Sequence, residues 1–240
     1  MRCAIVIPAR MGASRFPGKP LCDLLGKPMV QWVYEASVAS GVGDRVIVAT
    51  PDQEIVEACA AFGADAMLTR HDHNTGTDRI AEVATHVQAD VYVNVQGDEP
   101  LMRAESIAAC ARPMLDDPEI QVASVYCQAL PEDEDNPAAV KVVLDRQGFA
   151  LYFSRHAVPF PRNPRIEPLK KHIGLYAFTQ KALMDFANWP STPLEQTESL
   201  EQLRFMENGV RIKMSYAEGS ELAVDTPEQA DEVRQILANQ

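Results

Sequence analysis

A cationic loop follows the first apolar segment of the chain and constrains the fold more than any other stretch. Residues 4–7 predict a buried strand that ends at Pro8, because proline has no N–H to donate to a sheet. Arg10, Arg15 and Lys19 then follow among glycine, serine and proline residues. Glycine lets backbone N–H groups approach an anion, and arginine and lysine supply the counter-charge. The stretch therefore predicts a phosphate-binding loop at the carboxyl end of a strand.

Two common phosphate loops do not fit this stretch. A Walker loop has four residues between its first glycine and a Gly-Lys pair that precedes Ser or Thr. Here five residues separate Gly12 from Gly18, and Pro20 follows Lys19. No G-x-G-x-x-G motif follows the first strand, which counts against a dinucleotide-binding fingerprint.

Length and composition limit the class of protein. The 240 residues are enough for one α/β domain with an insertion, and no apolar run reaches the ~20 residues that span a bilayer. The start of the chain lacks a secretory signal, so we expect a cytoplasmic protein. The net charge of −12 argues against nucleic-acid or membrane partners. The five cysteines form no C-x-x-C motif, which predicts reduced thiols in the core.

Apolar periodicity predicts an α/β fold with a mostly parallel twisted sheet and helices on both faces. Ligands then bind at the carboxyl ends of the strands. Acidic residues 131–137 predict a solvated linker, and residues 140–144 and 149–154 predict an antiparallel hairpin insertion. Residues 222–224 are expected to form the last strand before a capped final helix. The other predicted strands are 45–50, 64–68, 90–95, 122–127, 172–178 and 210–216, and the other helices lie near 29–36, 55–62, 75–87, 105–115, 180–186 and 200–208.

Two aspartates come directly after predicted strands. Asp98 lies in QGDEP and Asp225 in AVDTP. The residues alone also fit a plain turn at Asp98 and a helix-entry residue at Asp225. In a site that uses a triphosphate, however, Mg²⁺ is held by one or two carboxylates together with phosphate oxygens and water. His71 and His73 have a metal-like spacing but no third ligand, so we expect them to be solvated.

Several motifs, in order along essentially the whole chain, resemble those of the 3-deoxy-manno-octulosonate (Kdo) cytidylyltransferases, which make CMP-Kdo for bacterial lipopolysaccharide. They are PARMGASRFPGKPL, TGTDR, QGDEP, YFSR, KHIG-x-Y, LEQLR and VDTPE. Thr75 stands where the family has serine and keeps the hydroxyl. The resemblance implies a Rossmann-like nucleotidyltransferase fold that transfers CMP from CTP to Kdo, and it suggests a homodimer. It implies one domain, with residues 1–130 mainly binding the nucleotide and 131–240 mainly serving sugar binding and dimerisation.

The resemblance also implies roles for individual residues. Asp98 and Asp225 would bind Mg²⁺, and Arg10, Arg15 and Lys19 would act with them on the phosphates during catalysis. The implied nucleotide-binding residues are Ala9, Arg10, Ser14, Arg15, Lys19, Thr69, Arg70, Gly76, Thr77, Gln96 and Asp98. The implied sugar-binding residues are Arg79, Gln96, Arg155, His172, Tyr176, Glu201 and Gln202.

A sugar acid needs a cation for its carboxylate and a ring of polar groups for its hydroxyls. Arg155 and His172 suit the first role, and Tyr176, Glu201 and Gln202 suit the second. Two other enzyme substrates stay open, namely 8-amino-Kdo, whose ammonium suits an acidic neighbour such as Glu201 or Glu221, and sialic acid. A non-catalytic nucleotide-sugar sensor is the alternative from another class, although a sensor does not require two metal ligands.

Overall fold

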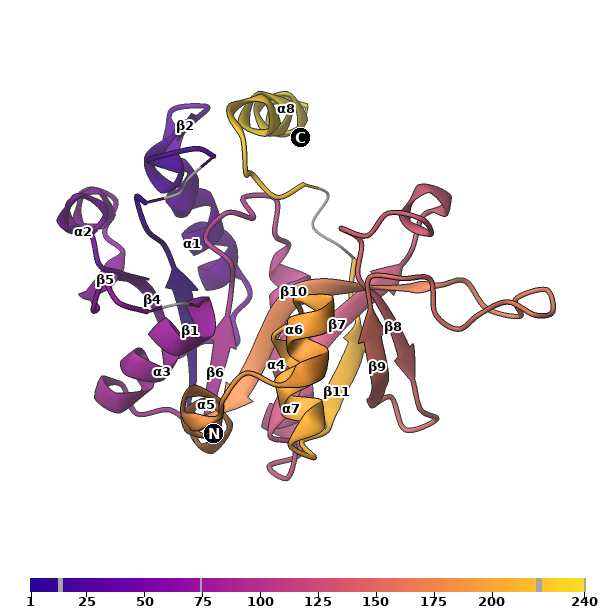
Figure 1. The fold of residues 1–240 in the computed structure, drawn as a ribbon. Coiled ribbons are helices and arrows are strands. Elements are labelled where there is room, and N and C mark those ends of the chain that lie inside the picture. The colour runs from indigo at the N-terminus through magenta and orange to yellow at the C-terminus, as the bar shows by residue number, and fades with distance from the viewer. Residues whose placement is uncertain (13–14, 74, 219–221, 240) are drawn as a thin grey trace.

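The strand that leads into the cationic loop lies inside the central sheet of the computed structural model (Figure 1). The structure describes residues 1–12, 15–73, 75–218 and 222–239. The sheet strands are β1 (Cys3–Pro8), β4 (Arg45–Thr50), β5 (Asp65–Leu68), β6 (Val91–Asn94), β7 (Val122–Gln128), β8 (Lys141–Leu144), β9 (Ala150–Ser154), β10 (Lys170–Thr179) and β11 (Ile212–Tyr216). The helices are α1 (Met29–Ala39), α2 (Gln53–Ala61), α3 (Gly76–His86), α4 (Ala104–Asp116), α5 (Gln180–Asn188), α6 (Pro193–Glu198), α7 (Gln202–Glu207) and α8 (Pro227–Ala238). Shorter elements are the 3-10 turns η1 (Lys19–Leu21) and η2 (Pro131–Asp133) and the small hairpin β2 (Asp23–Leu24) and β3 (Lys27–Pro28).

The sheet is mostly parallel, as predicted. In the described residues its order is β11-β7-β10-β6-β1-β4-β5. Strands β6, β1, β4 and β5 run parallel, and so do β7 and β11, whereas β10 is antiparallel to β6 and β7. The carboxyl ends of β1 and β6 therefore meet at one edge, where both predicted loops begin.

Helices cover both faces of the sheet, because side chains alternate between the faces along each strand. Ile5 and Ile7 of β1 pack in a core with α1, α2 and α4. Ala4 and Val6 of the same strand point into a second core with α3, α5 and α7. The cysteines are all free, and burial raises the pKa of Cys59 to about 11, as expected for reduced core thiols. None of the helices in the described ranges has the length and apolar character that a membrane crossing requires.

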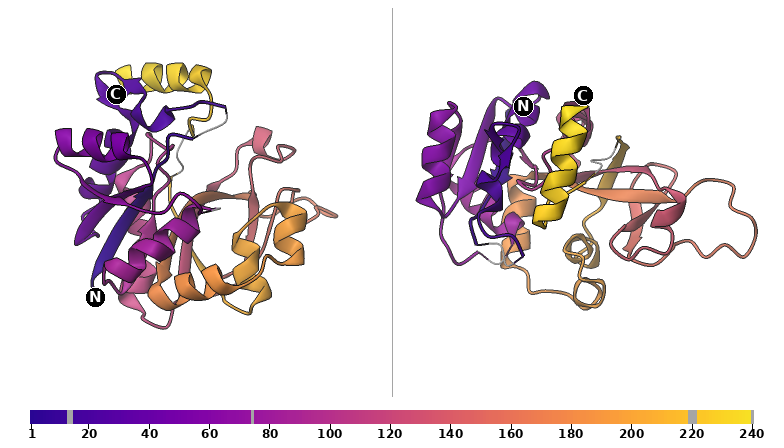
Figure 2. Two further views of the ribbon diagram at one scale, coloured as in Figure 1. Left: turned by 60° about the vertical axis from the view of Figure 1, so that its left-hand side comes forward. Right: turned by 90° about the horizontal axis from the view of Figure 1, so that it is seen from above.

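A third, smaller core joins α8 to the residues that follow the cationic loop. Leu24, Met29 and Val233 are among its fully buried members, and α8 lies against β2 at the end of the molecule farthest from the start of β1 (Figure 1, Figure 2). The predicted capping box at Thr226 opens α8. The predicted strand at 222–224 is wrong, because this segment crosses over the QGDEP loop with a backbone bond from Val224 N to Asp98 O of 2.8 Å instead of pairing in the sheet.

The predicted hairpin insertion is formed by β8 and β9, and β8 also pairs with β10. Lys141 at the start of β8 is fully buried, and its ammonium donates to the carbonyls of Asp133, Asn136, Ala139 and Arg155 at 2.6–3.3 Å. Residues 131–137 are therefore only partly a solvated linker, since this ammonium ties their backbone to the hairpin. The segment between β9 and β10, residues 155–169, projects from the body of the molecule, and we call it the 155–169 arm (Figure 2).

Candidate active site

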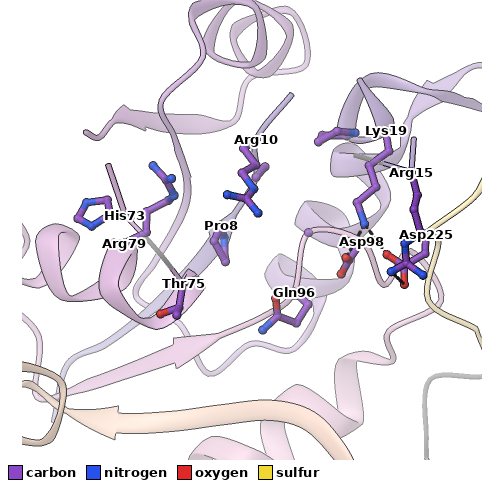
Figure 3. A pocket seen from close by; sticks show the side chains of 14 residues that line it. Pro8, Arg10, Arg15, Lys19, His73, Thr75, Arg79, Gln96, Asp98 and Asp225 are labelled. Atoms are coloured by element: carbon purple, nitrogen blue, oxygen red, sulfur yellow. Dashed lines mark hydrogen bonds and ion pairs between the residues drawn. The ribbon is translucent and has the colours of Figure 1, made fainter. Parts of the chain in front are cut away.

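A polar pocket of about 330 Å³ opens where the loops after β1 and β6 meet the start of α3 (Figure 3). Its lining contains four cations and two carboxylates, which suits a polyanionic ligand that brings a metal ion. The lining residues are Pro8, Ala9, Arg10, Arg15, Lys19, Pro20, His73, Thr75, Gly76, Arg79, Gln96, Gly97, Asp98 and Asp225.

Close backbone packing brings the two loops together. Gly97 lies directly against the end of β1, so that a Cβ at this position would stand 2.6 Å from the carbonyl oxygen of Pro8. The cationic loop is also tied down, because Met11 N donates to Asp52 Oδ2 at 2.7 Å and Gly18 N donates to Met11 O at 2.9 Å. Gly18 has a φ of 75°, a conformation that favours glycine, and it leads directly into η1 and Lys19.

We expect Gly97→Ala to lower the stability of the folded protein by about 2 kcal/mol, the usual cost of forcing extra atoms into a packed site. The added methyl group must push the QGDEP loop away from β1, because its nearest neighbour is backbone. Chemical denaturation measures the change. Gly12→Ala is the matched control, since a Cβ there meets no atom within 4 Å. Equal stability of the two variants would contradict this account of the packing.

One end of the pocket holds Lys19, Asp98, Asp225 and Arg15. The ammonium of Lys19 lies 2.7 Å from Asp98 Oδ2, 3.1 Å from Asp225 Oδ1 and 3.0 Å from the carbonyl of Val224. Arg15 reaches the other oxygen of Asp225 at 2.8 Å. Burial alone would lower the pKa of Lys19, but the two carboxylates outweigh it and raise that pKa. The two predicted metal ligands thus come together, although they lie far apart in the sequence.

The other end of the pocket is cationic and contains Arg10, Arg79 and His73 (Figure 3). Arg79 is buried and donates to the carbonyl of Arg70 at 3.0 Å and to the hydroxyl of Thr69. Burial lowers the pKa of Arg79, and the nearby positive charge of Arg10 adds to this effect. Two guanidinium groups that repel each other in this way form a good site for an anion.

The expectation that His73 is solvated is wrong. Its side chain is only 6% exposed, it lines the pocket, and its Nε2 pairs with Glu82 on α3. Glu82 also accepts a hydrogen bond of 3.0 Å from Arg70 N, so it ties both Arg70 and His73 to α3. His71 is exposed, as expected. In the sequence, Glu82 follows the capping residue Asp78 by one helical turn, so both carboxylates are expected on the same side of the helix. This spacing was the signal that could have pointed to Glu82 as the partner of His73.

The capping box predicted at the start of α3 is present. Thr75 and Asp78 exchange side chain to backbone bonds of 3.1 Å in each direction. Thr75 and Gly76 consequently line the pocket, whereas Thr77 points toward Glu201, with a hydroxyl to carboxylate distance of 3.2 Å.

The structure gathers most of the predicted nucleotide-binding residues around the pocket. Those that line it are Ala9, Arg10, Arg15, Lys19, Gly76, Gln96 and Asp98. Thr69 and Arg70 support Arg79 from behind the pocket wall, and Thr77 faces the second half of the chain. Ser14 lies outside the described residues, as does Glu221.

The predicted sugar-binding residues fall into two groups. Arg79 and Gln96 line the pocket, whereas His172, Tyr176, Glu201 and Gln202 lie beside it on β10 and at the start of α7. The ring of His172 lies 5.0 Å from that of Phe153 and 5.2 Å from that of Tyr176, between centroids. Glu201 is exposed. Gln202 is buried, and its amide nitrogen has no hydrogen-bond partner among the described residues.

Burial disfavours a cationic role for His172, whereas the sugar-binding role of Arg155 stays a prediction. Burial lowers the pKa of His172 to about 3, so the ring is neutral and its Nε2 pairs with the hydroxyl of Ser124 at 3.0 Å. The guanidinium of Arg155 donates to three backbone carbonyls, those of Pro137, Glu198 and Ser199, at 2.6–3.0 Å. Arg155 therefore fastens α6 to the hairpin and lies outside the pocket lining.

Glu99 is a carboxylate near the site to which the sequence analysis assigned no role. Its side chain points toward Gly174 in the irregular part of β10, and Oε2 is buried without a partner in the described part of the chain. The pKa of Glu99 is raised to about 8, mainly by burial and also by the neighbouring charge of Asp98.

The fold and the pocket define a nucleotidyltransferase, and comparison with known proteins specifies its family. A family model described as cytidylyltransferase matches residues 4–212. The chain belongs to this family and, within it, to the 3-deoxy-manno-octulosonate cytidylyltransferases, as the motifs indicated.

The relatives match over nearly their whole length. The protein of this name from Escherichia coli is 44% identical over 100% of this chain and 97% of its own, and that from Pseudomonas syringae pv. tomato is 48% identical over 97% of each chain. A solved structure of CMP:2-keto-3-deoxy-manno-octonic acid synthetase complexed with CTP matches with a TM-score of 0.97 and 42% identity, covering 100% of this chain and 99% of the other. A Leptospira borgpetersenii cytidylyltransferase, at 16% identity and a TM-score of 0.68, shares the fold.

Proposed function

We propose that this protein transfers CMP from CTP to Kdo, giving CMP-Kdo and pyrophosphate. The observation that carries the proposal is the convergence of Asp98, Asp225 and Lys19 at one end of a pocket whose remaining cations suit a triphosphate. The relatives named for this reaction, and the related structure with CTP, support the choice of nucleotide and sugar. We place the reaction in the cytoplasm, where its product serves lipopolysaccharide synthesis.

The reaction requires positioning and charge stabilisation. A sugar hydroxyl oxygen attacks the α-phosphorus, the bond to the bridging oxygen breaks, and pyrophosphate leaves on the opposite side. Arg10, Arg15 and Lys19 would offset the negative charge that builds on the leaving pyrophosphate. Hydrogen bonds from Met11 N and Gly18 N hold the backbone of the loop, which restricts where these side chains can place their charges.

Asp98 and Asp225 are suited to hold Mg²⁺. Both present hard carboxylate oxygens to a single point, which is now occupied by the ammonium of Lys19. The described ranges contain no group of three or more His, Cys, Asp or Glu side chains placed to hold a metal ion, so phosphate oxygens and water would complete the coordination. Mg²⁺ held there would offset phosphate charge and would make the attacking hydroxyl more acidic.

The groups beside the pocket are suited to sugar hydroxyls. Tyr176, Glu201 and Gln202 supply donors and acceptors, and Thr77 links them to the pocket through its contact with Glu201. Arg79 lines the pocket and is on the same helix as Thr77, so the sugar carboxylate would pair with Arg79, whereas Arg155 lies outside the pocket lining.

Pyrophosphate release from CTP and Kdo, measured with Mg²⁺ present, tests the proposal. We expect pyrophosphate release only when CTP, Kdo and Mg²⁺ are all present, and a reaction without the sugar is the control. CTP binding without release of pyrophosphate would overturn the enzyme assignment and favour a sensor.

We also propose a homodimer formed through the 155–169 arm. Phe160 and Ile166 on this arm are 84% and 100% exposed, and large apolar side chains of this kind commonly mark an interface. A Phe160→Glu, Ile166→Glu double variant should sediment as a monomer at a concentration where the unaltered protein is dimeric. Val38→Glu, at an exposed position on α1, is the control and should not change the mass. A monomeric unaltered protein would contradict the proposal.

A further inference from the structure

The ammonium of Lys19 occupies the position that the two proposed metal ligands share. Its three oxygen contacts, to Asp98, Asp225 and the carbonyl of Val224, lie between 2.7 and 3.1 Å. The side chain is 13% exposed, so little water competes for these contacts. Figure 3 shows the nitrogen pointing into the space between the two aspartates.

A divalent cation held by both carboxylates requires the same space. Mg²⁺ binds oxygen at about 2.0–2.1 Å, which is shorter than either contact of the ammonium, so the two cations cannot share the position. The positive charge of Lys19 would also repel the metal ion at such close range.

We propose that Lys19 is an exchangeable counter-ion, which keeps the two carboxylates together in the nucleotide-free enzyme and leaves when metal and nucleotide bind. The inference rests on the proposed role of Asp98 and Asp225 as metal ligands. Removing the ammonium without a replacement would leave two negatively charged carboxylates facing each other without a counter-charge. Nucleotide phosphates provide the new anionic partner that allows Lys19 to leave, so binding of metal and nucleotide is coupled.

Backbone bonds hold the chain on both sides of Lys19, from Gly18 N to Met11 O at 2.9 Å and from Leu21 N to Gly18 O at 3.0 Å, and Pro20 is buried. We therefore expect the ammonium to move by rotation of the side chain. Arg10, in the same pocket, makes no hydrogen bond or ion pair to any described residue, so it is already available to an incoming phosphate. The nucleotide thus meets a free cation first, and Lys19 can follow.

Binding of Mn²⁺ to the nucleotide-free protein, measured by electron paramagnetic resonance, tests the inference without a catalytic readout. We expect weak binding by the unaltered protein and binding by Lys19→Met that is tighter by about 10- to 100-fold, the usual range for coupled sites. Lys19→Arg keeps the charge and should behave like the unaltered protein. Arg10→Met removes a charge from the same pocket without touching either carboxylate, and should change Mn²⁺ affinity little.

The outcomes separate this inference from the proposed function. If Lys19→Met binds Mn²⁺ no more tightly, while Asp98→Asn abolishes Mn²⁺ binding in the presence of CTP, the counter-ion inference is wrong and the metal assignment stands. If neither Asp98→Asn nor Asp225→Asn changes Mn²⁺ binding with CTP, both fail. Thermal unfolding checks that each variant is folded, and Lys19→Gln, which keeps polar contact with the same oxygens, replaces a methionine variant that does not fold.

Discussion

Replacing either Asp98 or Asp225 by asparagine is expected to abolish CMP transfer, with a loss in kcat of at least about 10³-fold, because a metal ion stabilises charge in the transition state by several kcal/mol. Asparagine has the same shape as aspartate, so no cavity forms. In each variant Lys19 keeps the other carboxylate as a partner, and the melting temperature should change little. Steady-state pyrophosphate release at several Mg²⁺ concentrations, together with thermal unfolding, measures both effects.

A control for these two variants lies on α8. Asp231 is close to Asp225 in sequence, its side chain is 70% exposed, and it pairs with Arg234. Asp231→Asn therefore removes one negative charge from the same end of the molecule without altering the site, and should keep full activity. Normal Mg²⁺-dependent turnover in either Asp98→Asn or Asp225→Asn would remove the basis for the metal assignment.

Kdo is expected to be a far better substrate than N-acetylneuraminic acid, by as much as ~10⁴-fold in kcat/KM. Discrimination is strong where a poor substrate leaves a buried polar group unpaired. Gln202 is 5% exposed and its amide nitrogen has no partner among the described residues, so it is a group of this kind. Competition between the two sugars at equal concentration gives the ratio directly.

The 8-amino analogue of Kdo provides the sharper comparison. Its ammonium suits an acidic neighbour, and Glu201 is exposed beside the pocket. Glu201→Gln should therefore reduce the use of the amino sugar more than that of Kdo, whereas Glu105→Gln on α4 should change neither. A preference of the unaltered protein for the amino sugar would overturn the assignment of Kdo and leave the metal chemistry intact.

The parts of the structure that the sequence predicted are those with a local cause. Strand β1 is a continuous apolar run that ends at Pro8, and α3 begins at a capping box that Thr75 and Asp78 form by themselves. The cationic loop and QGDEP could likewise be assigned from neighbouring residues. Their meeting in one pocket follows from the rule that parallel strands place their carboxyl ends together.

The errors concern features whose cause is distant in the sequence. Residues 222–224 have a strand-like pattern but meet the carbonyl of Asp98 instead of a sheet edge. The sequence also did not predict that Arg155 donates to carbonyls of Pro137, Glu198 and Ser199, because these residues lie before β8 and at the end of α6. Helix α6 and the hairpin of β2 and β3 are short and lack a repeating apolar pattern, so periodicity could not identify them.

The small core beneath α8 has a consequence for how the site opens. Asp225 N donates to Gln229 on α8 at 2.7 Å, and the buried side chains of this helix, Ala230 and Val233, belong to the small core. Segments with their own limited set of apolar contacts can unfold locally at a lower free energy than the whole domain. Amide hydrogens of α8 should then exchange faster than those of β1 or β6, and we expect the segment that carries Asp225 to open before the sheet does.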